Sequence, residues 1–229
     1  GGVMPVAKRL RLEVGRELAA EYVCQRREMG VLNIGGPGRV TVDGREFTLA
    51  TRECLYIGRG SRDIEFASES SEYPARMFLL SYPAHAPLPT TKATMNDARR
   101  IELGSVATAN HRTIYQFIHE GGIRSCQLVM GFTELHEGSV WNTFPPHRHD
   151  RRTEVYCYFD LPSDGLVVHL FGEPDDTRHL LVREGEAIVS PAWSIHSGVG
   201  TGPYRFIWGM GGENQTFDDM DPVNPASLV

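Results

Sequence analysis

The sequence predicts an all-β protein built from two consecutive, jelly-roll-like β-barrels. Helix signals are scarce, whereas short β-branched or aromatic segments bounded by turn residues recur along the whole chain. A pattern of strand, glycine turn and strand in residues 36–60 returns, weakly, in residues 178–191. The 229 residues suit either one large β domain or two domains of ordinary size, and the repeat favours two.

The predicted strands are short apolar segments that end at glycine, proline or aspartate. The clearest of them are residues 39–43, 76–81, 126–130, 155–159 and 166–171. Asp43-Gly44 and Ser163-Asp164-Gly165 are predicted to be hairpin turns, because glycine accepts a positive φ at little cost.

The predicted boundary between the two barrels is rich in proline. Pro83, Pro87 and Pro89 lie among small residues, and no apolar period continues through them. We therefore expect a first, degenerate barrel in residues 1–82, a linker in residues 83–94 and a second barrel in residues 95–229. Only the second carries closely spaced histidines, so the first is expected to be structural or an oligomer contact.

Charge and composition exclude several classes of partner. The net charge is −6 and no block of basic residues stands out, which argues against a nucleic-acid surface. No apolar run approaches the length of a membrane span, so no membrane partner is expected.

Four widely spaced cysteines without a C-x-x-C motif predict reduced thiols in a cytoplasmic protein. The chain begins with glycine, which suggests a start inside a longer product or after a removed tag.

Four residues of the second half have the spacing of metal ligands. His147 and His149 face the same side of an extended strand, because side chains alternate along it. Glu154 has the opposite parity, so the strand has to be interrupted between His149 and Glu154. His196 is the fourth candidate. Three imidazoles and one carboxylate suit Zn, Mn, Fe, Co or Ni.

These positions resemble the two motifs of the cupin superfamily, G-x5-H-x-H-x3–4-E-x6-G and G-x5-P-x-G-x2-H-x3-N. All four ligand positions match, and Gly185 and Pro191 precede His196 at the motif spacing. The chain departs from the motifs at positions away from the ligands, where Trp141, Leu161, Trp193 and Gly200 replace three glycines and an asparagine. The resemblance implies two cupin-type barrels with the metal site in the second.

Longer stretches around these ligands resemble the 5-keto-4-deoxyuronate isomerase family. They are residues 143–160, 190–200 and 206–221, and the similarity also reaches Gly1-Gly2-Val3-Met4-Pro5 at the start. Members generally extend further at the N-terminus, so the first barrel is expected to be truncated.

The resemblance implies a cytoplasmic, zinc-dependent ketol-isomerase of pectin and related uronate breakdown. Such an enzyme interconverts 5-dehydro-4-deoxy-D-glucuronate and 3-deoxy-D-glycero-2,5-hexodiulosonate. By match to the motifs, His147, His149, Glu154 and His196 hold one Zn2+ per subunit. The family is a homohexamer.

The residues that move the proton and bind the substrate are less clearly marked. Tyr158 shares the parity of Glu154, and Glu213 follows two glycines, so both are candidates for proton transfer. Arg151 and Arg152 lie between two ligand-bearing segments and are candidates for binding a substrate carboxylate through the planar guanidinium. The alternative interpretation of the two arginines is a charged surface turn.

Two other functions fit a cupin. One is an iron-dependent dioxygenase on the same scaffold, which metal analysis and an oxygen-consumption assay would distinguish. The other is a metal-stabilised sugar-binding or storage protein, which would bind a ligand without isomerising it. A fold and a ligand set do not by themselves decide the reaction.

Overall fold

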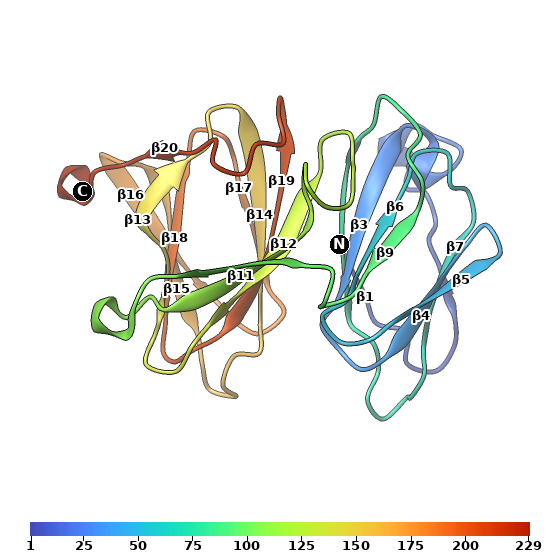
Figure 1. The fold of residues 1–229 in the computed structure, drawn as a ribbon, viewed down its shortest axis with the longest axis horizontal. Coiled ribbons are helices and arrows are strands. Elements are labelled where there is room, and N and C mark those ends of the chain that lie inside the picture. Colours follow the sequence, from blue (N-terminus) through green and yellow to red (C-terminus); the bar gives the residue numbers. More distant parts are fainter. The chain divides into compact units, whose positions relative to one another are not determined.

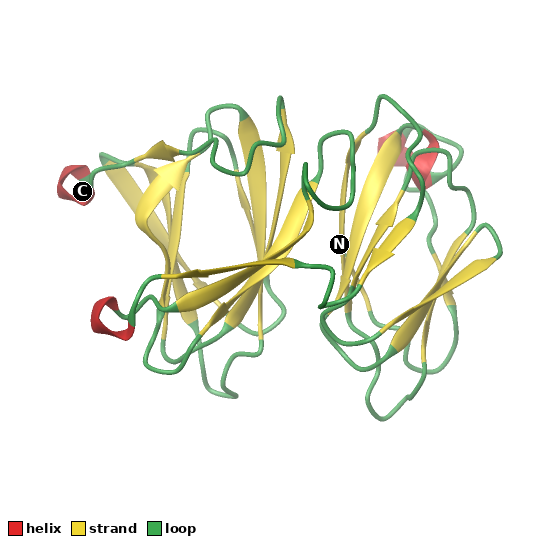
Figure 2. Cartoon of the chain, viewed as in Figure 1, coloured by secondary structure: helices red, strands yellow, loops and turns green.

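The computed structural model describes residues 1–229 and consists almost entirely of β-strands (Figures 1 and 2). The only helices are 3-10 turns of three residues, none of which could span a lipid bilayer: η1 (Arg16–Leu18), η2 (Val23–Gln25), η3 (Val106–Thr108) and η4 (Pro225–Ser227). The chain divides into two compact units. Unit 1 comprises residues 1–98 and 117–128, and unit 2 comprises residues 99–116 and 129–229. The predicted all-β class is confirmed.

Unit 1 contains a five-stranded sheet, in the order β1-β8-β3-β6-β9, and a four-stranded sheet, in the order β2-β7-β4-β5. Its core is apolar and draws on both sheets, with Val31, Leu55, Val40 and Phe66 all buried. The strands are β1 (Gly2–Val3), β2 (Leu10–Arg11), β3 (Arg27–Asn33), β4 (Gly38–Val42), β5 (Arg45–Leu49), β6 (Cys54–Ile57), β7 (Ile64–Ser68), β8 (Met77–Pro83) and β9 (Thr91–Ala93).

Unit 2 contains a six-stranded sheet, in the order β10-β11-β12-β19-β14-β17, and a five-stranded sheet, in the order β16-β15-β18-β13-β20. Buried aromatic and β-branched side chains fill its core, among them Tyr158, Val167, Val182 and Phe206. The strands are β10 (Arg99–Leu103), β11 (Arg112–Ile118), β12 (Val129–Leu135), β13 (Trp141–Arg148), β14 (Arg152–Phe159), β15 (Val167–Glu173), β16 (Asp176–Val182), β17 (Ala187–Ser190), β18 (Ile195–Gly200), β19 (Arg205–Gly212) and β20 (Asp221–Pro222).

The two units repeat one strand order. In unit 1, β8-β3-β6 are neighbours in one sheet and β7-β4-β5 in the other; in unit 2, β19-β14-β17 and β18-β15-β16 are arranged in the same way. All of these pairings are antiparallel. The weak sequence repeat therefore corresponds to a repeated jelly-roll topology. In each unit the strands form two separate sheets rather than one closed barrel.

One of the two predicted hairpin turns is a hairpin and the other is not. Asp43 and Gly44 join β4 to β5, and their φ values of 48° and 83° are those of the tight turn that suits hairpin twist. Residues 163–165 do form a turn, with the Gly165 N–H donating to the Pro162 carbonyl. They connect β14 to β15, which belong to different sheets, because turn residues mark a reversal but do not choose the partner strand.

The segment 83–94, which the sequence predicts to be a linker, lies within unit 1. It ends in β9, which pairs with β6 as the edge strand of the larger sheet. Proline disrupts the apolar pattern but is compatible with the approach to an edge strand, since an edge leaves one row of backbone groups unpaired. The boundary between the units is therefore set by contacts between distant parts of the chain, and not by the proline-rich segment.

Residues 117–128 return to unit 1 and are bound there by a buried carboxylate. Glu28 accepts hydrogen bonds from the backbone N–H groups of Cys126, Gln127 and Leu128 at 2.6–2.8 Å, and from the Tyr56 hydroxyl at 2.8 Å. These bonds hold residues 126–128 out of the strand that the sequence predicts at 126–130, so that β12 begins only at Val129. Such charge-assisted bonds satisfy a carboxylate that water cannot reach.

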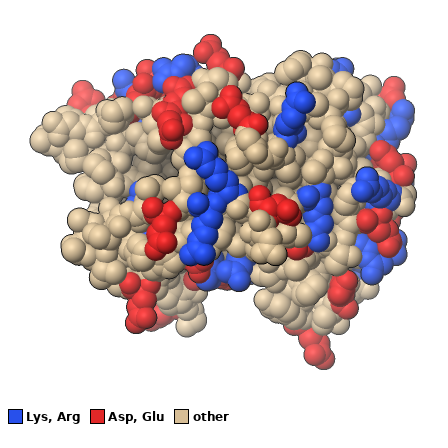
Figure 3. All heavy atoms as spheres, viewed as in Figure 1, with Lys and Arg blue, Asp and Glu red and all other residues tan.

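Acidic and basic side chains are interspersed on the face of the molecule seen in Figure 3. Several surface charges form ion pairs, such as Lys92 with Glu53 and Arg39 with Glu46. A surface of mixed sign lacks the broad positive field that attracts a polyanion.

Candidate metal centre

Three strands and one turn of unit 2 bring the four predicted ligands together. His147 lies near the end of β13, His149 in the turn that follows, Glu154 in β14 and His196 in β18. His147 and His196 are directly paired across β13 and β18, whereas Glu154 lies in the other sheet. The predicted break between His149 and Glu154 is confirmed, since the chain crosses there from one sheet to the other.

The ligand atoms of the four side chains converge on one point. The Nε2 atom of His147 lies 3.3 Å from that of His149 and 3.0 Å from that of His196. The Oε2 atom of Glu154 lies 3.0 Å and 2.9 Å from the Nε2 atoms of His149 and His196. A tetrahedral ion with bonds of about 2.0–2.1 Å sets its ligand atoms about 3.3 Å apart. The spacing therefore fits a transition-metal ion.

Hydrogen bonding sets the protonation of one of these imidazoles. The Nδ1 atom of His149 lies 2.8 Å from the backbone carbonyl of Asp219, which can only accept, so Nδ1 carries the proton. Its Nε2 atom is then unprotonated and directs a lone pair at the cluster. A backbone carbonyl that fixes the tautomer is the usual partner of a metal-binding histidine.

Burial also favours the protonation states that bind metal. It lowers the pKa of His147 to about 3, with the neighbouring His196 acting in the same direction. Burial by itself raises the pKa of Glu154, but the interactions of its carboxylate with His196 and His149 outweigh burial and hold that pKa well below its usual range. The cluster thus presents a carboxylate and neutral imidazole, which are the forms that coordinate cations.

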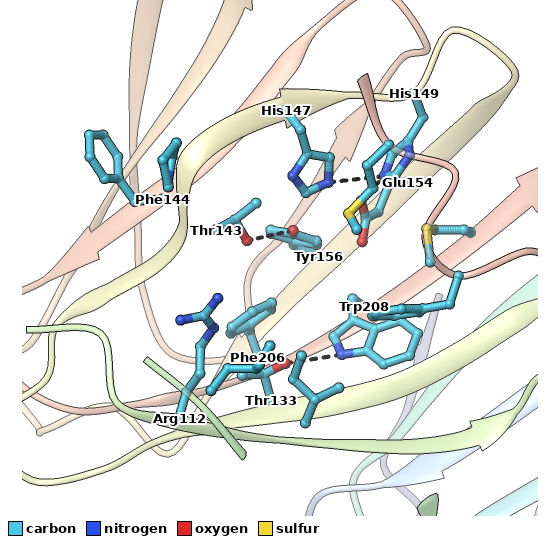
Figure 4. Close-up of a pocket in the computed structure, with 16 residues that line it drawn as sticks. Arg112, Thr133, Thr143, Phe144, His147, His149, Glu154, Tyr156, Phe206 and Trp208 are labelled. Carbon is cyan, nitrogen blue, oxygen red and sulfur yellow. Dashed lines mark hydrogen bonds and ion pairs between the residues drawn. The ribbon is translucent and has the colours of Figure 1, made fainter. Parts of the chain in front are cut away.

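A cavity of about 260 Å³ opens beside three of these residues (Figure 4). Its wall is mostly apolar. The register of β13 shifts between Asn142 and His147, and the consecutive residues Thr143, Phe144 and Pro145 of this irregular stretch all line the cavity. The lining residues are Leu103, Arg112, Ile114, Thr133, Thr143, Phe144, Pro145, His147, His149, Glu154, Tyr156, Phe206, Trp208, Met210, Phe217 and Met220.

Arg112 is the only basic residue besides the histidines that lines this cavity. Figure 4 shows it at the opposite end from His147, His149 and Glu154. Its Nη1 atom donates to the Asn110 carbonyl at 2.9 Å, and no carboxylate pairs with it. Burial lowers its pKa from the ordinary arginine value, so the charge is held in a partly dry site without a counter-ion. An anionic ligand would supply that counter-ion.

The sequence and structure comparisons identify the family. A family model described as the KduI/IolB family matches residues 2–223. The chain is 53% identical over 230 residues to a 4-deoxy-L-threo-5-hexosulose-uronate ketol-isomerase of Kineococcus radiotolerans, covering 99% of this chain and 82% of the relative. It is 49% identical over 228 residues to the protein of that name in Caldicellulosiruptor bescii, covering 100% and 83%. The chain belongs to the KduI/IolB family.

Solved structures show that the fold is cupin-like. An IolB-like protein from Salmonella typhimurium LT2 matches with a TM-score of 0.79 and 13% identity, over 97% of this chain and 86% of that one. Oxalate decarboxylase from Bacillus subtilis matches with a TM-score of 0.60 and 12% identity, over 84% and 64%. The fold prediction is confirmed. With ketol-isomerase relatives at about half identity over its full length, this member of the KduI/IolB family is an isomerase.

Arg151 and Arg152, expected to bind a substrate carboxylate, do not line the cavity in this KduI/IolB-family protein. Arg151 forms ion pairs with Asp219 and Asp221. Arg152 is 1% exposed and donates to the carbonyls of Thr216 and Asp219, both at 2.7 Å. Both guanidinium groups are directed at the segment 214–221, named here the 214–221 strap, and sequence proximity to the ligands could not reveal this.

The strap completes the site. It contributes Phe217 and Met220 to the cavity wall, and its Asp219 carbonyl is the acceptor for His149. Asn214 also pairs with Asp219 within the strap. The two arginines therefore position the strap that orients His149 and forms part of the cavity wall.

Neither predicted proton-transfer residue reaches the cavity. Tyr158 does point to the inner face of β14, as its parity predicts, but it lies deeper in the core, where its hydroxyl is 2.7 Å from the Nδ1 atom of His169. Glu213 is exposed and does not line the cavity. Tyr156, midway between Glu154 and Tyr158, lines the cavity instead, and its hydroxyl is 2.9 Å from the Thr143 hydroxyl. Strand parity places Glu154, Tyr156 and Tyr158 on the same face of β14. Only the tertiary structure shows how deep in the core each side chain lies.

We expect Arg152→Met to weaken metal binding by roughly 10–100-fold, because loss of a residue that orients a metal-binding histidine typically costs that much. Competition with a chromogenic chelator would measure it. The matched control is Arg148→Met, which removes an arginine whose partners, Asp150 and Glu173, are on the surface. Equal metal affinity in both variants, with circular dichroism spectra unchanged, would show that the strap stays in place without Arg152.

Proposed function

We propose that this protein is a zinc-dependent ketol-isomerase of unsaturated-uronate breakdown, including that of pectin. Its substrates are taken to be 5-dehydro-4-deoxy-D-glucuronate and 3-deoxy-D-glycero-2,5-hexodiulosonate. The observation that carries the proposal is a single cavity with a metal-binding cluster at one end and unpaired Arg112 at the other. That arrangement suits a short sugar acid with a carbonyl at one end and a carboxylate at the other. The name of the relatives agrees with it.

Zinc is proposed from the donor set. Three imidazole nitrogens and one carboxylate oxygen at tetrahedral spacing suit Zn2+, and the ligand types do not require a redox metal. When bound, a zinc ion polarises a carbonyl oxygen and stabilises the negative charge that develops on it. We assign the ligand roles to His147, His149, Glu154 and His196.

The reaction moves a carbonyl from one carbon to its neighbour and needs no co-reactant. A proton leaves the carbon next to the carbonyl and is returned to the former carbonyl carbon, while a second proton moves between the two oxygens. Arg112 would hold the substrate carboxylate through paired N–H donors, which fixes the distance from the carboxylate to the reacting carbons. Apolar walls formed by Phe206, Trp208 and Phe217 would exclude water.

Two features of the cavity bear on proton transfer. Tyr156 is buried, and burial, reinforced by the charge of Glu154, raises its pKa well above the ordinary tyrosine value. Tyr156 therefore stays protonated and, with Thr143, is suited to donate hydrogen bonds to substrate oxygens. Glu154 is the only carboxylate of the cavity wall, so a carboxylate base there would have to be this residue.

The direct test is incubation of the protein with 5-dehydro-4-deoxy-D-glucuronate. Its conversion is followed by NMR, and oxygen consumption is recorded in parallel. We expect isomerisation by the wild type without oxygen uptake, and at least a 1,000-fold loss in His149→Ala, roughly what electrostatic stabilisation of a transition state contributes. The control is His179→Ala, on exposed β16 of the same sheet as His147. Oxygen uptake would instead indicate a dioxygenase, and ligand binding without conversion a binding protein. Unfolding of His149→Ala would assign the metal a structural role.

We expect Arg112→Met to raise KM by roughly 10- to 150-fold, which corresponds to about 1.5–3 kcal/mol for a charged hydrogen bond. Because substrate and product both carry the carboxylate, the interaction contributes equally to ground and transition states, and kcat should change less than KM. Arg99→Met, at an exposed position on β10, is the control. A KM equal to that of the wild type would place the carboxylate elsewhere.

We also propose a homohexamer in the cytoplasm. The outermost strands β16 and β17 of the two sheets of unit 2 carry exposed Leu180, Leu181 and Val189, the last 70% exposed. Open sheet edges with apolar side chains favour pairing with another copy. The four cysteines form no disulfide, in keeping with a reducing compartment. Light scattering should give six times the chain mass, whereas a monomeric mass at micromolar protein would contradict the assembly.

A further inference from the structure

Unit 2 contains a second cluster of metal-ligand side chains, outside the cavity. Glu102 lies on β10, His111 directly precedes β11, and His136 follows β12. One ligand atom from each of the three lies within 4.8 Å of the other two. None of these residues lines the cavity or contacts the cluster around Glu154.

Backbone hydrogen bonds set the spacing of this cluster. The His136 N–H donates to the His111 carbonyl at 3.0 Å, and the His111 N–H donates to the Ser139 hydroxyl at 2.9 Å. Glu102 is paired with Thr113 across the β10–β11 ladder. The three Cα positions are therefore held by main-chain hydrogen bonds and by the Ser139 hydroxyl before any ion is present.

The side chains already face one another. The Oε1 atom of Glu102 is 2.8 Å from the Nε2 atom of His111, and the imidazole rings of His111 and His136 are 4.4 Å apart between centroids. The Thr113 hydroxyl lies 2.7 Å from the Nε2 atom of His136, so it orients that ring and leaves the other nitrogen available. A hydrogen bond to the second nitrogen is characteristic of histidines that bind metals.

Charge and access also suit a cation. The hydrogen bond from His111 lowers the pKa of Glu102, which remains a carboxylate at neutral pH. The side chains of Glu102 and His111 are 58% and 29% exposed, so an ion can enter from solvent and water can complete its coordination. Two imidazoles and one carboxylate with open positions form a common donor set for Zn2+ and neighbouring divalent metals.

We propose that Glu102, His111 and His136 form a second, solvent-accessible site for a divalent transition metal such as Zn2+. With three ligands and partial exposure, it binds more weakly than the four-ligand cluster and fills after it. The adjacent residues Leu103 and Arg112 line the cavity. An ion at this site would tie β10 to the turn after β12, on the outer side of the wall that carries Arg112.

The test is a Zn2+ titration of the intact protein by calorimetry after the four-ligand cluster has been filled with one equivalent. We expect a second equivalent to bind to the wild type and to His179→Ala, which removes an exposed histidine far from the cluster in sequence. Binding of that second equivalent should weaken at least 10-fold in His111→Ala and in Glu102→Gln. The first equivalent should be unchanged in every variant, which also shows that the variants are folded.

Two results would overturn the proposal. One is saturation of the wild type at a single equivalent. The other is a second equivalent that His111→Ala and Glu102→Gln bind as tightly as the wild type, since that ion would occupy some other surface group. The titration measures binding alone, so its outcome is independent of whether the protein isomerises a uronate.

Discussion

The hydrogen bond between the His149 Nδ1–H group and the Asp219 carbonyl is the contact on which the site depends. It decides which nitrogen of His149 is free to bind a metal, and it joins the turn after β13 to the 214–221 strap. Arg152 donates to the same carbonyl and to that of Thr216, while Arg151 is paired with the side chains of Asp219 and Asp221. One group of contacts thus orients a ligand and closes one side of the cavity.

The cavity combines two charges that an apolar wall normally excludes. The carboxylate of Glu154 lies within 3.0 Å of two histidine nitrogens, and the guanidinium of Arg112 has only a backbone carbonyl as partner. A buried charge without a counter-ion destabilises the folded protein unless a ligand of opposite charge binds to it. Selectivity for an anionic substrate would follow from this imbalance, since a neutral sugar would leave Arg112 uncompensated.

The repeated strand order identifies the strands of unit 1 that correspond to those of the candidate metal centre in unit 2. By topology, β3 and β7 of unit 1 correspond to β14 and β18, which provide Glu154 and His196. In unit 1 these strands contribute buried Met29 and Ile64 to an apolar core. At Met29 and Ile64 the scaffold of unit 1 is packed with apolar side chains, whereas the corresponding strands of unit 2 carry Glu154 and His196.

The sequence alone was sufficient to predict the β class, the Asp43-Gly44 hairpin and the four residues that converge in the metal centre. Period-two alternation and the short spacing from His147 to Glu154 are local properties, so they survive into the folded chain, whereas His196 was identified by its match to the second cupin motif. The roles of Arg151, Arg152 and Tyr158, and the place of residues 83–94 and 117–128, were decided by contacts between distant segments. Arg112 carried no signal of its own, because only the pairing of β11 with β10 and β12 brings its side chain to the cavity wall. Parity tells which face a side chain takes, but its depth and its partner depend on which strands pack against it.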